Sequence, residues 1–171
     1  MTKGISVTSA VVTISGSTAE AAAGVFEQET VPLNLDILNR EVMLVYAIDI
    51  NPDAPDAQAA VNSSVECSLS TTSRTTMGNI SNTNVLGSAN KSIRAAGFLD
   101  GGVAYQDVSP ETPASNALEY IGIISTSDFF VQVQGFNNLA TKSADWRMWC
   151  ARARVTADIY AALVQGSALS A

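Results

Sequence analysis

The chain contains no histidine among its 171 residues, and this absence removes the most common general base in proteins. Nucleophilic catalysis of the Ser–His–Asp or Cys–His type is therefore excluded for this chain acting alone. Zinc binding is disfavoured as well, because imidazole is missing and Cys67 and Cys150 do not form a C-x-x-C pair. The three lysines, Lys3, Lys91 and Lys142, belong to no recognisable Ser–Lys or phosphate-binding motif. We therefore expect no enzymatic activity and no cofactor.

Positive charge is scarce too: nine Lys and Arg stand against sixteen Asp and Glu, for a formal net charge of −7. Proteins that bind nucleic acid directly neutralise phosphates with basic side chains, so no direct sequence-specific nucleic-acid binding is expected. Long apolar runs are also missing. No stretch approaches the roughly 18 residues of a membrane-spanning helix, so no membrane span is expected. Aromatic residues make up only 6% of the chain, which disfavours the aromatic-lined cleft of a glycosidase.

What the chain does contain is period-two alternation of apolar and polar residues, interrupted by Asn, Ser, Gly and Pro. The alternation is clear in residues 31–37, 61–69, 129–136 and 146–159, while apolar residues fill both faces of 42–50 apart from Asp49. This pattern predicts an all-β fold, a β-sandwich of jelly-roll or Greek-key topology. An immunoglobulin-like sandwich is the nearest rival.

Shorter signals complete the predicted organisation. Ser17 to Glu20 has capping-box form, which predicts a short helical turn near residues 18–24, with a mobile arm as the alternative. A second helical turn is predicted near 159–165. Three segments follow from these patterns: an N-terminal strand and arm (1–29), a single β-sandwich domain (30–165) and a loose C-terminal tail (166–171).

Two stretches read as loops. Residues 49–56 hold two prolines and several carboxylates, and residues 73–92 are rich in Thr, Asn, Ser and Gly. A loop as long as 73–92 inside a compact domain is usually functional, an interface element, or ordered only on assembly. In the strand predicted at 129–136, Gln132 and Gln134 are expected to face water.

The acidic loop is the only candidate for a metal site. Asp49, Asn51 and Asp53 stand at the first, third and fifth positions of a calcium-loop pattern. The rest of that pattern is missing, because Pro52 stiffens the loop and no glycine or glutamate follows at the required positions. The three residues are weak candidates for a calcium site, and a solvated connection between strands is the simpler interpretation.

The one concentration of cationic and aromatic side chains lies in the last predicted strand. Arg147, Trp149, Arg152 and Arg154 are candidates for an interface with a neighbouring subunit, since Arg and Trp are enriched where interfaces carry binding energy. The alternative is an ordinary outer strand face with arginines stacked on aromatics. If the interface hypothesis is right, charge reversal at Arg152 and Arg154 should weaken assembly without unfolding the subunit.

Cys67 and Cys150 lie far apart in sequence, each inside a predicted strand. We interpret them as small buried hydrophobic residues, and a disulfide between facing strands is the alternative.

In general character the chain resembles small viral structural proteins, particularly single jelly-roll capsid subunits. The features that carry the resemblance are architectural: the arm 1–29, the strand 42–50, the loop 73–92, and the closing strands 129–136 and 146–159. The resemblance implies a virion structural protein that self-assembles into a symmetric shell. It also implies copies of itself and other virion proteins as partners, and a location in the virion after assembly in the host cytoplasm.

The chain departs from that family in its acidity. Coat proteins that condense a genome usually carry a basic arm, whereas residues 1–29 hold a single basic residue, Lys3. A capsid-associated decoration protein fits the charge equally well. A different class also stays open: a secreted or surface β-sandwich module that binds a carbohydrate or a calcium-dependent ligand. Trp146 and Trp149 are the only hint of the exposed aromatic row that such a module would use.

Overall fold

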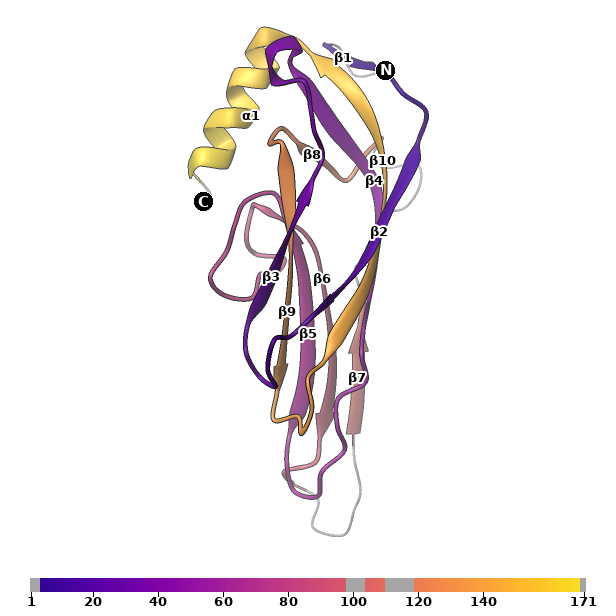
Figure 1. The fold of residues 1–171 in the computed structure, drawn as a ribbon, viewed down its shortest axis with the longest axis vertical. Coiled ribbons are helices and arrows are strands. Elements are labelled where there is room, and N and C mark those ends of the chain that lie inside the picture. Colours follow the sequence, from indigo (N-terminus) through magenta and orange to yellow (C-terminus); the bar gives the residue numbers. More distant parts are fainter. Residues whose placement is uncertain (1–3, 98–103, 110–118, 170–171) are drawn as a thin grey trace.

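Two antiparallel five-stranded sheets form the body of the protein in the computed structural model, which describes residues 4–97, 104–109 and 119–169. Sheet A contains β1 (Ile5–Val7), β2 (Val12–Ala19), β4 (Glu41–Pro52), β8 (Gly122–Ile124) and β10 (Ser143–Val155). Sheet B contains β3 (Glu27–Pro32), β5 (Ser63–Ser70), β6 (Val85–Arg94), β7 (Ala104–Val108) and β9 (Asp128–Phe136). The remaining elements are a 3₁₀ turn, η1 (Ile37–Asn39), and a helix, α1 (Ala157–Leu169). The predicted β-sandwich is confirmed (Figure 1).

The strand pairing identifies the topology as a jelly roll. The antiparallel pairs β2·β10, β3·β9, β4·β8 and β5·β6 are nested one inside the other. A single long antiparallel ribbon, turning between β5 and β6 and wrapped around the core, gives this nesting. The wrapping produces the order β2-β10-β4-β8 in one sheet and β3-β9-β5-β6 in the other. Strand β7 is an additional strand on the edge of sheet B, paired with β6.

The core lies between the two sheets and is organised around one large aromatic contact. The rings of Phe129 and Trp146 meet edge to face, with 5.6 Å between their centroids. Gly16 lies against Trp146, and a Cβ atom at this glycine would come within 2.6 Å of the indole. Cys67 and Cys150 belong to the same core as free, buried thiols, which confirms the hydrophobic interpretation. Burial raises the pKa of the Cys67 thiol to about 12.

Helix α1 covers part of the opposite, outer face of sheet A. Its residues Ile159, Tyr160 and Leu163 pack against a second apolar cluster, made by Val42, Leu44, Ala153 and Val155. The helix is longer than the turn predicted near 159–165, and the last strand ends at Val155 rather than near residue 159. In the described part of the chain, no helix is both long and apolar enough to cross a membrane.

The helical turn predicted near residues 18–24 is wrong. Thr18 continues strand β2, and no helix follows it. The buried Glu20 carboxylate accepts hydrogen bonds from the backbone N–H groups of Gly24 (3.1 Å), Gly135 (2.6 Å) and Lys142 (2.9 Å). Two of those donors are distant in sequence. A tertiary contact therefore uses the side chain that the local pattern assigned to a helix cap.

Both predicted loops are shorter in the structure. Strand β4 extends to Pro52 and so includes Asp49 and Asn51. Strand β6 takes up residues 85–94, which leaves 71–84 as the connection from β5. Arg74 fixes this connection, because its guanidinium donates to the Thr76 carbonyl and to the side-chain oxygens of Asn82 and Asn84. The loop is thus ordered by contacts within a single chain.

Gln132 is fully buried, so the expectation that it faces water is wrong. Its amide accepts from Ser68 Oγ (2.7 Å) and donates to Ser70 Oγ (2.8 Å) and Gln28 Oε1 (3.0 Å). The backbone N–H of Gly78 donates to the same Ser68 hydroxyl (3.1 Å). The 71–84 loop therefore folds over the outer face of sheet B and buries a polar network there.

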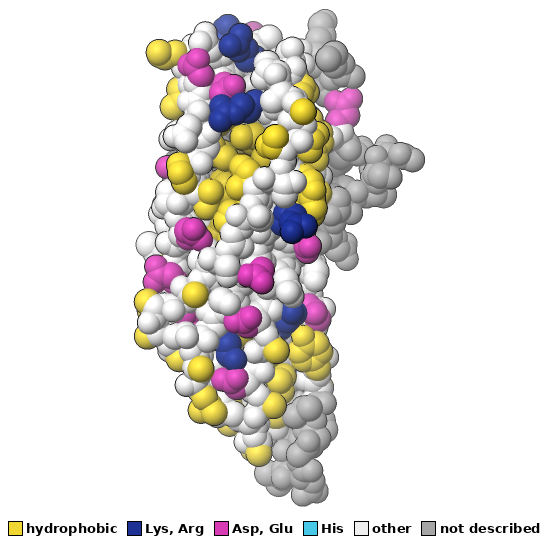
Figure 2. Space-filling model, turned by 45° about the vertical axis from the view of Figure 1, so that its right-hand side comes forward, with side chains coloured by type: hydrophobic (Ala, Val, Ile, Leu, Met, Phe, Trp, Pro, Cys, Tyr) yellow, Lys and Arg dark blue, Asp and Glu magenta, His cyan; other side chains and the backbone are white. Residues whose placement is uncertain are grey.

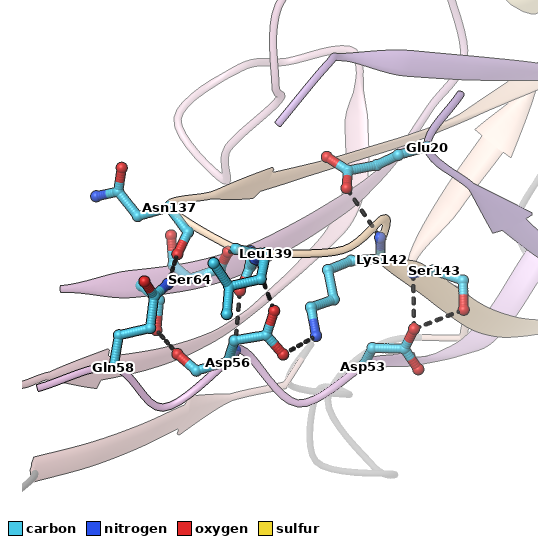
Figure 3. Close-up of polar contacts among 11 residues, drawn as sticks. Glu20, Asp53, Asp56, Gln58, Ser64, Asn137, Leu139, Lys142 and Ser143 are labelled. Carbon is cyan, nitrogen blue, oxygen red and sulfur yellow. Dashed lines mark hydrogen bonds and ion pairs between the residues drawn. The ribbon is translucent and has the colours of Figure 1, made fainter. Parts of the chain in front are cut away.

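Three connections meet at one end of the sandwich in a network of charged side chains (Figure 3). Asp56, between β4 and β5, forms an ion pair with Lys142, between β9 and β10, at 2.6 Å, and accepts from the Leu139 N–H at 2.8 Å. Asp53 accepts from both the backbone N–H (2.7 Å) and the hydroxyl (2.8 Å) of Ser143. Together with Glu20, these carboxylates tie the β2–β3, β4–β5 and β9–β10 connections to one another.

This network predicts a loss of stability in acid. The hydrogen bond from Lys142, followed by that from the Leu139 N–H, holds the pKa of Asp56 below its usual value of 3.8. The stabilisation is therefore present above about pH 3.8 and is lost as the pH falls through the lower folded-state pKa. Asp56→Asn should lower the melting temperature near neutral pH, and the difference from wild type should shrink below that value. Thermal melts of both proteins from about pH 7 to about pH 2.5 would check this, and a constant difference would contradict it.

Candidate assembly interface

The outer face of sheet A is ordered in rows across three strands. Residues paired directly in an antiparallel sheet project to the same face. Three rows read Thr13–Trp149–Ala47, Ser15–Arg147–Asp49 and Ser17–Asp145–Asn51, across β2, β10 and β4. The character of the face thus changes along the strands, from the apolar surface beneath α1 to a charged end.

Apolar surface continues from the cluster beneath α1 toward the charged end, and Tyr46 at its border also packs against that cluster. We name this surface the outer-face patch and define it as Val7, Tyr46, Ala47 and Trp149. Val7 is exposed and the other three are half-buried. Figure 2 shows hydrophobic side chains gathered in the upper half of the side where β1, β2, β10 and β4 lie in Figure 1. Exposed apolar patches rimmed by polar residues are typical of interaction sites.

A β-bulge places two of the patch residues on one face. The register between β10 and β4 shifts between Trp149, opposite Ala47, and Cys150, opposite Val45, so Tyr46 has no partner of its own. Tyr46 and Ala47 therefore both belong to the outer face, although they are adjacent in sequence. Period-two alternation predicts opposite faces for such neighbours, so the sequence pattern could not have revealed this pair.

The charged end of the face begins directly beside the patch. The guanidinium of Arg147 lies over the Trp149 ring, 5.7 Å from its centroid. Asp49 pairs with Arg147 across the strands, and Asp145 lies two residues away on the same face. Both aspartates are exposed, and neither carboxylate makes an ion pair or hydrogen bond with another residue in the described ranges. They are available to a cationic partner.

The four residues predicted as one interface strip do not share a face. Arg147 and Trp149 belong to the outer face, whereas Arg152 pairs with Met43 and Arg154 with Glu41 on the inner-face register of β10. Arg152 is occupied within the chain, because it forms an ion pair with Glu41 at 2.6 Å. Charge reversal at Arg152 would therefore perturb the fold itself, which makes it unsuitable as a test of assembly.

The candidate metal ligands are used in other ways. Asn51 accepts a hydrogen bond from Lys91 Nζ at 2.6 Å, and the Asp53 carboxylate is engaged by Ser143. Asp49 lies on the outer face, in a strand rather than in a loop. Within residues 4–97, 104–109 and 119–169, no group of three or more Cys, Asp or Glu side chains is placed to hold a metal ion.

The two tryptophans proposed as an aromatic row point to opposite faces of β10. Trp146 is 4% exposed and lies in the core, while Trp149 lies in the outer-face patch. They therefore present no shared platform for a sugar ring.

Replacing Trp149 by aspartate should weaken any contact made by the patch. Loss of a central interface Trp typically costs at least about 2 kcal/mol of binding, or roughly 30-fold in affinity. We expect Trp149→Asp to lower assembly strongly in light scattering, with a melting temperature close to that of wild type. Phe136→Asp is a matched control, because Phe136 is a 43% exposed aromatic residue on β9 of the other sheet.

Comparisons with known proteins yield structural likeness only. No protein family model matches this chain, and neither does any curated protein. One similar solved structure is that of the nodavirus of the giant freshwater prawn Macrobrachium rosenbergii, as a semi-empty virus-like particle. Its TM-score is 0.37 at 11% sequence identity, and the match covers 86% of this chain and 95% of that chain. Another is the structure of Desmodium yellow mottle tymovirus. Its TM-score is 0.31 at 12% sequence identity, and the match covers 86% of this chain and 90% of that chain. Both come from viruses, in line with the architecture-level resemblance expected from the sequence, but at these TM-scores neither likeness carries a functional argument.

Proposed function

We propose that this protein is a structural subunit that assembles with copies of itself into a symmetric particle, as a capsid subunit or as a capsid-associated decoration protein. The observation that carries the proposal is the outer-face patch, with Asp49 and Asp145 at its border and without a partner among the described residues. A partly exposed Trp and Tyr beside exposed carboxylates add little to the stability of a monomer, whereas a subunit interface uses both.

The jelly roll supports the same proposal. Viral capsid and lectin domains both use this fold, so the fold alone does not choose between a shell and a binding module. A jelly roll whose loops are joined by side-chain hydrogen bonds and an ion pair is expected to be a rigid domain. Symmetric repetition of a rigid domain multiplies weak contacts into a stable assembly.

The carbohydrate-binding or calcium-dependent alternative finds less support in the geometry. Trp146 and Trp149 lie on opposite sides of β10, and the Asn51 and Asp53 side chains are already engaged by Lys91 and Ser143. No observation on the described residues favours this alternative over assembly.

Light scattering coupled to size exclusion, followed by electron microscopy, tests the proposal. We expect the purified protein to form a closed oligomer or particle of uniform size, with its population rising with protein concentration. A protein that stays monomeric at all accessible concentrations and ionic strengths would overturn the proposal.

A further inference from the structure

The β3–β4 connection presents two large apolar side chains to solvent. Leu38 is 95% exposed and Ile37 is 49% exposed, and both lie in η1. We name these two residues the loop knob. A single exposed leucine on a flexible loop needs no explanation, but this loop is held in place at several points.

Local hydrogen bonds fix the turn that carries the knob. The Asp36 carboxylate caps it, accepting from the backbone N–H (3.2 Å) and side-chain amide (2.5 Å) of Asn39. The backbone N–H of Asp36 in turn donates to Glu41 Oε2 (2.9 Å). Arg40 closes the turn in the left-handed region, with φ of 56°.

Arg152 anchors both flanks of the turn to strand β10. Its guanidinium pairs with Glu41 (2.6 Å) after the turn and donates to the carbonyl oxygens of Leu33 (2.9 Å) and Asn34 (3.3 Å) before it. The loop knob is therefore pre-organised, and docking it costs little conformational entropy. The sequence predicted that Arg152 itself contacts a neighbouring subunit. In this geometry Arg152 is instead a positioning residue, which holds the loop that contacts the neighbour.

The net charge around the knob is opposite to the net charge around the outer-face patch. Two exposed arginines lie close to the knob: Arg40 follows it in the chain, and Arg154 lies opposite Glu41 in the sheet. The exposed Asp36 of the same turn offsets only one of these two charges.

The patch is bordered by two aspartates, Asp49 and Asp145, which make no ion pair or hydrogen bond with another described residue, and by one cation, Arg147, so this border carries a net negative charge. Leu38 is almost fully exposed, so it does not occupy the patch of its own chain.

We infer that the loop knob of one copy docks on the outer-face patch of the next, with Arg40 and Arg154 facing Asp49 and Asp145. The inference rests on the proposed function and names the partner of its interface. Because two different surfaces meet, the contact is heterologous, and its repetition closes into a ring where the rotation between copies allows.

Three variants test the contact. Leu38→Asp removes the knob, Trp149→Asp removes the patch, and Ile80→Asp is the control, because Ile80 is 87% exposed on the unrelated β5–β6 loop. We expect Leu38→Asp and Trp149→Asp each to be folded monomers with melting temperatures near that of wild type. Ile80→Asp should assemble as wild type does.

Mixing the two monomeric variants separates a heterologous contact from a self-complementary one. The Trp149→Asp protein still has a knob and the Leu38→Asp protein still has a patch, so the mixture should form one-to-one pairs. Native mass spectrometry would detect them at twice the 17.8 kDa subunit mass.

The outcomes distinguish this inference from the proposed function. A wild-type protein that never assembles overturns both. Normal assembly by Leu38→Asp, or equal loss of assembly by Ile80→Asp, overturns the knob and leaves self-assembly standing. Two monomeric variants that form no pairs on mixing overturn the heterologous geometry.

Discussion

Trp146→Ala is expected to lower the free energy of unfolding by about 3–5 kcal/mol, the range for removing a large buried aromatic residue from a core. Trp146 is 4% exposed, meets Phe129 edge to face, and donates its indole N–H to Thr18 Oγ1 at 3.2 Å. The substitution leaves a cavity between the sheets, and Thr18 Oγ1 loses the hydrogen bond from the indole N–H. Gly16, whose missing side chain makes room for the indole, would face the empty space.

Urea denaturation of wild type and Trp146→Ala measures this loss. Trp149→Ala is the matched control, because the same residue type three positions along the same strand lies on the outer face. We expect the control to lose a much smaller share of stability while impairing assembly. Equal destabilisation by the two substitutions would contradict the assignment of Trp146 to the core and Trp149 to the surface.

Glu20→Ala is expected to destabilise the subunit by about 1–3 kcal/mol, the cost of leaving the buried N–H of Gly135 without an acceptor. The carboxylate of this buried residue serves three backbone donors, on Gly24, Gly135 and Lys142. Its loss leaves the β2–β3 and β9–β10 connections joined there by the backbone hydrogen bond from the Glu20 N–H to the Lys142 carbonyl (2.9 Å). Hydrogen exchange should then rise at Gly135 and Lys142 more than in the core strands.

Glu20→Gln is the control for this prediction. The amide keeps one acceptor oxygen at nearly the same volume, so we expect it to retain part of the lost stability. If the alanine and glutamine variants were both as stable as wild type, the prediction would be contradicted, because the Glu20 carboxylate would then not join these segments.

The sequence predicted the sandwich because strand alternation is a local property. The run 42–50 was apolar on both faces, and the structure shows why: Met43 and Val45 face the other sheet, whereas Val42 and Leu44 lie beneath α1. The free cysteines followed from their strand context in the same way. Where burial follows directly from alternation, local reasoning was sufficient.

Local reasoning failed where a side chain serves a partner distant in sequence. Glu20 fitted a capping box and instead accepts from Gly135 in β9 and from Lys142 in the following loop, both more than a hundred residues away. Gln132 occupied a solvent-facing position by alternation, yet the 71–84 loop buries it. The strip of Arg147, Trp149, Arg152 and Arg154 mixed the two faces of β10, because its members were grouped by closeness along the chain.

The amino-acid order by itself determined the layered β architecture, the lack of imidazole chemistry and the acidic charge, since each depends on composition or on a period of two residues. Only tertiary structure decided which apolar residues pack beneath α1, which carboxylates are bound by other segments, and that Arg152 holds a loop. The physical reason is that burial and hydrogen-bond pairing depend on all the chain segments that meet at a point. In a jelly roll those segments come from opposite ends of the sequence.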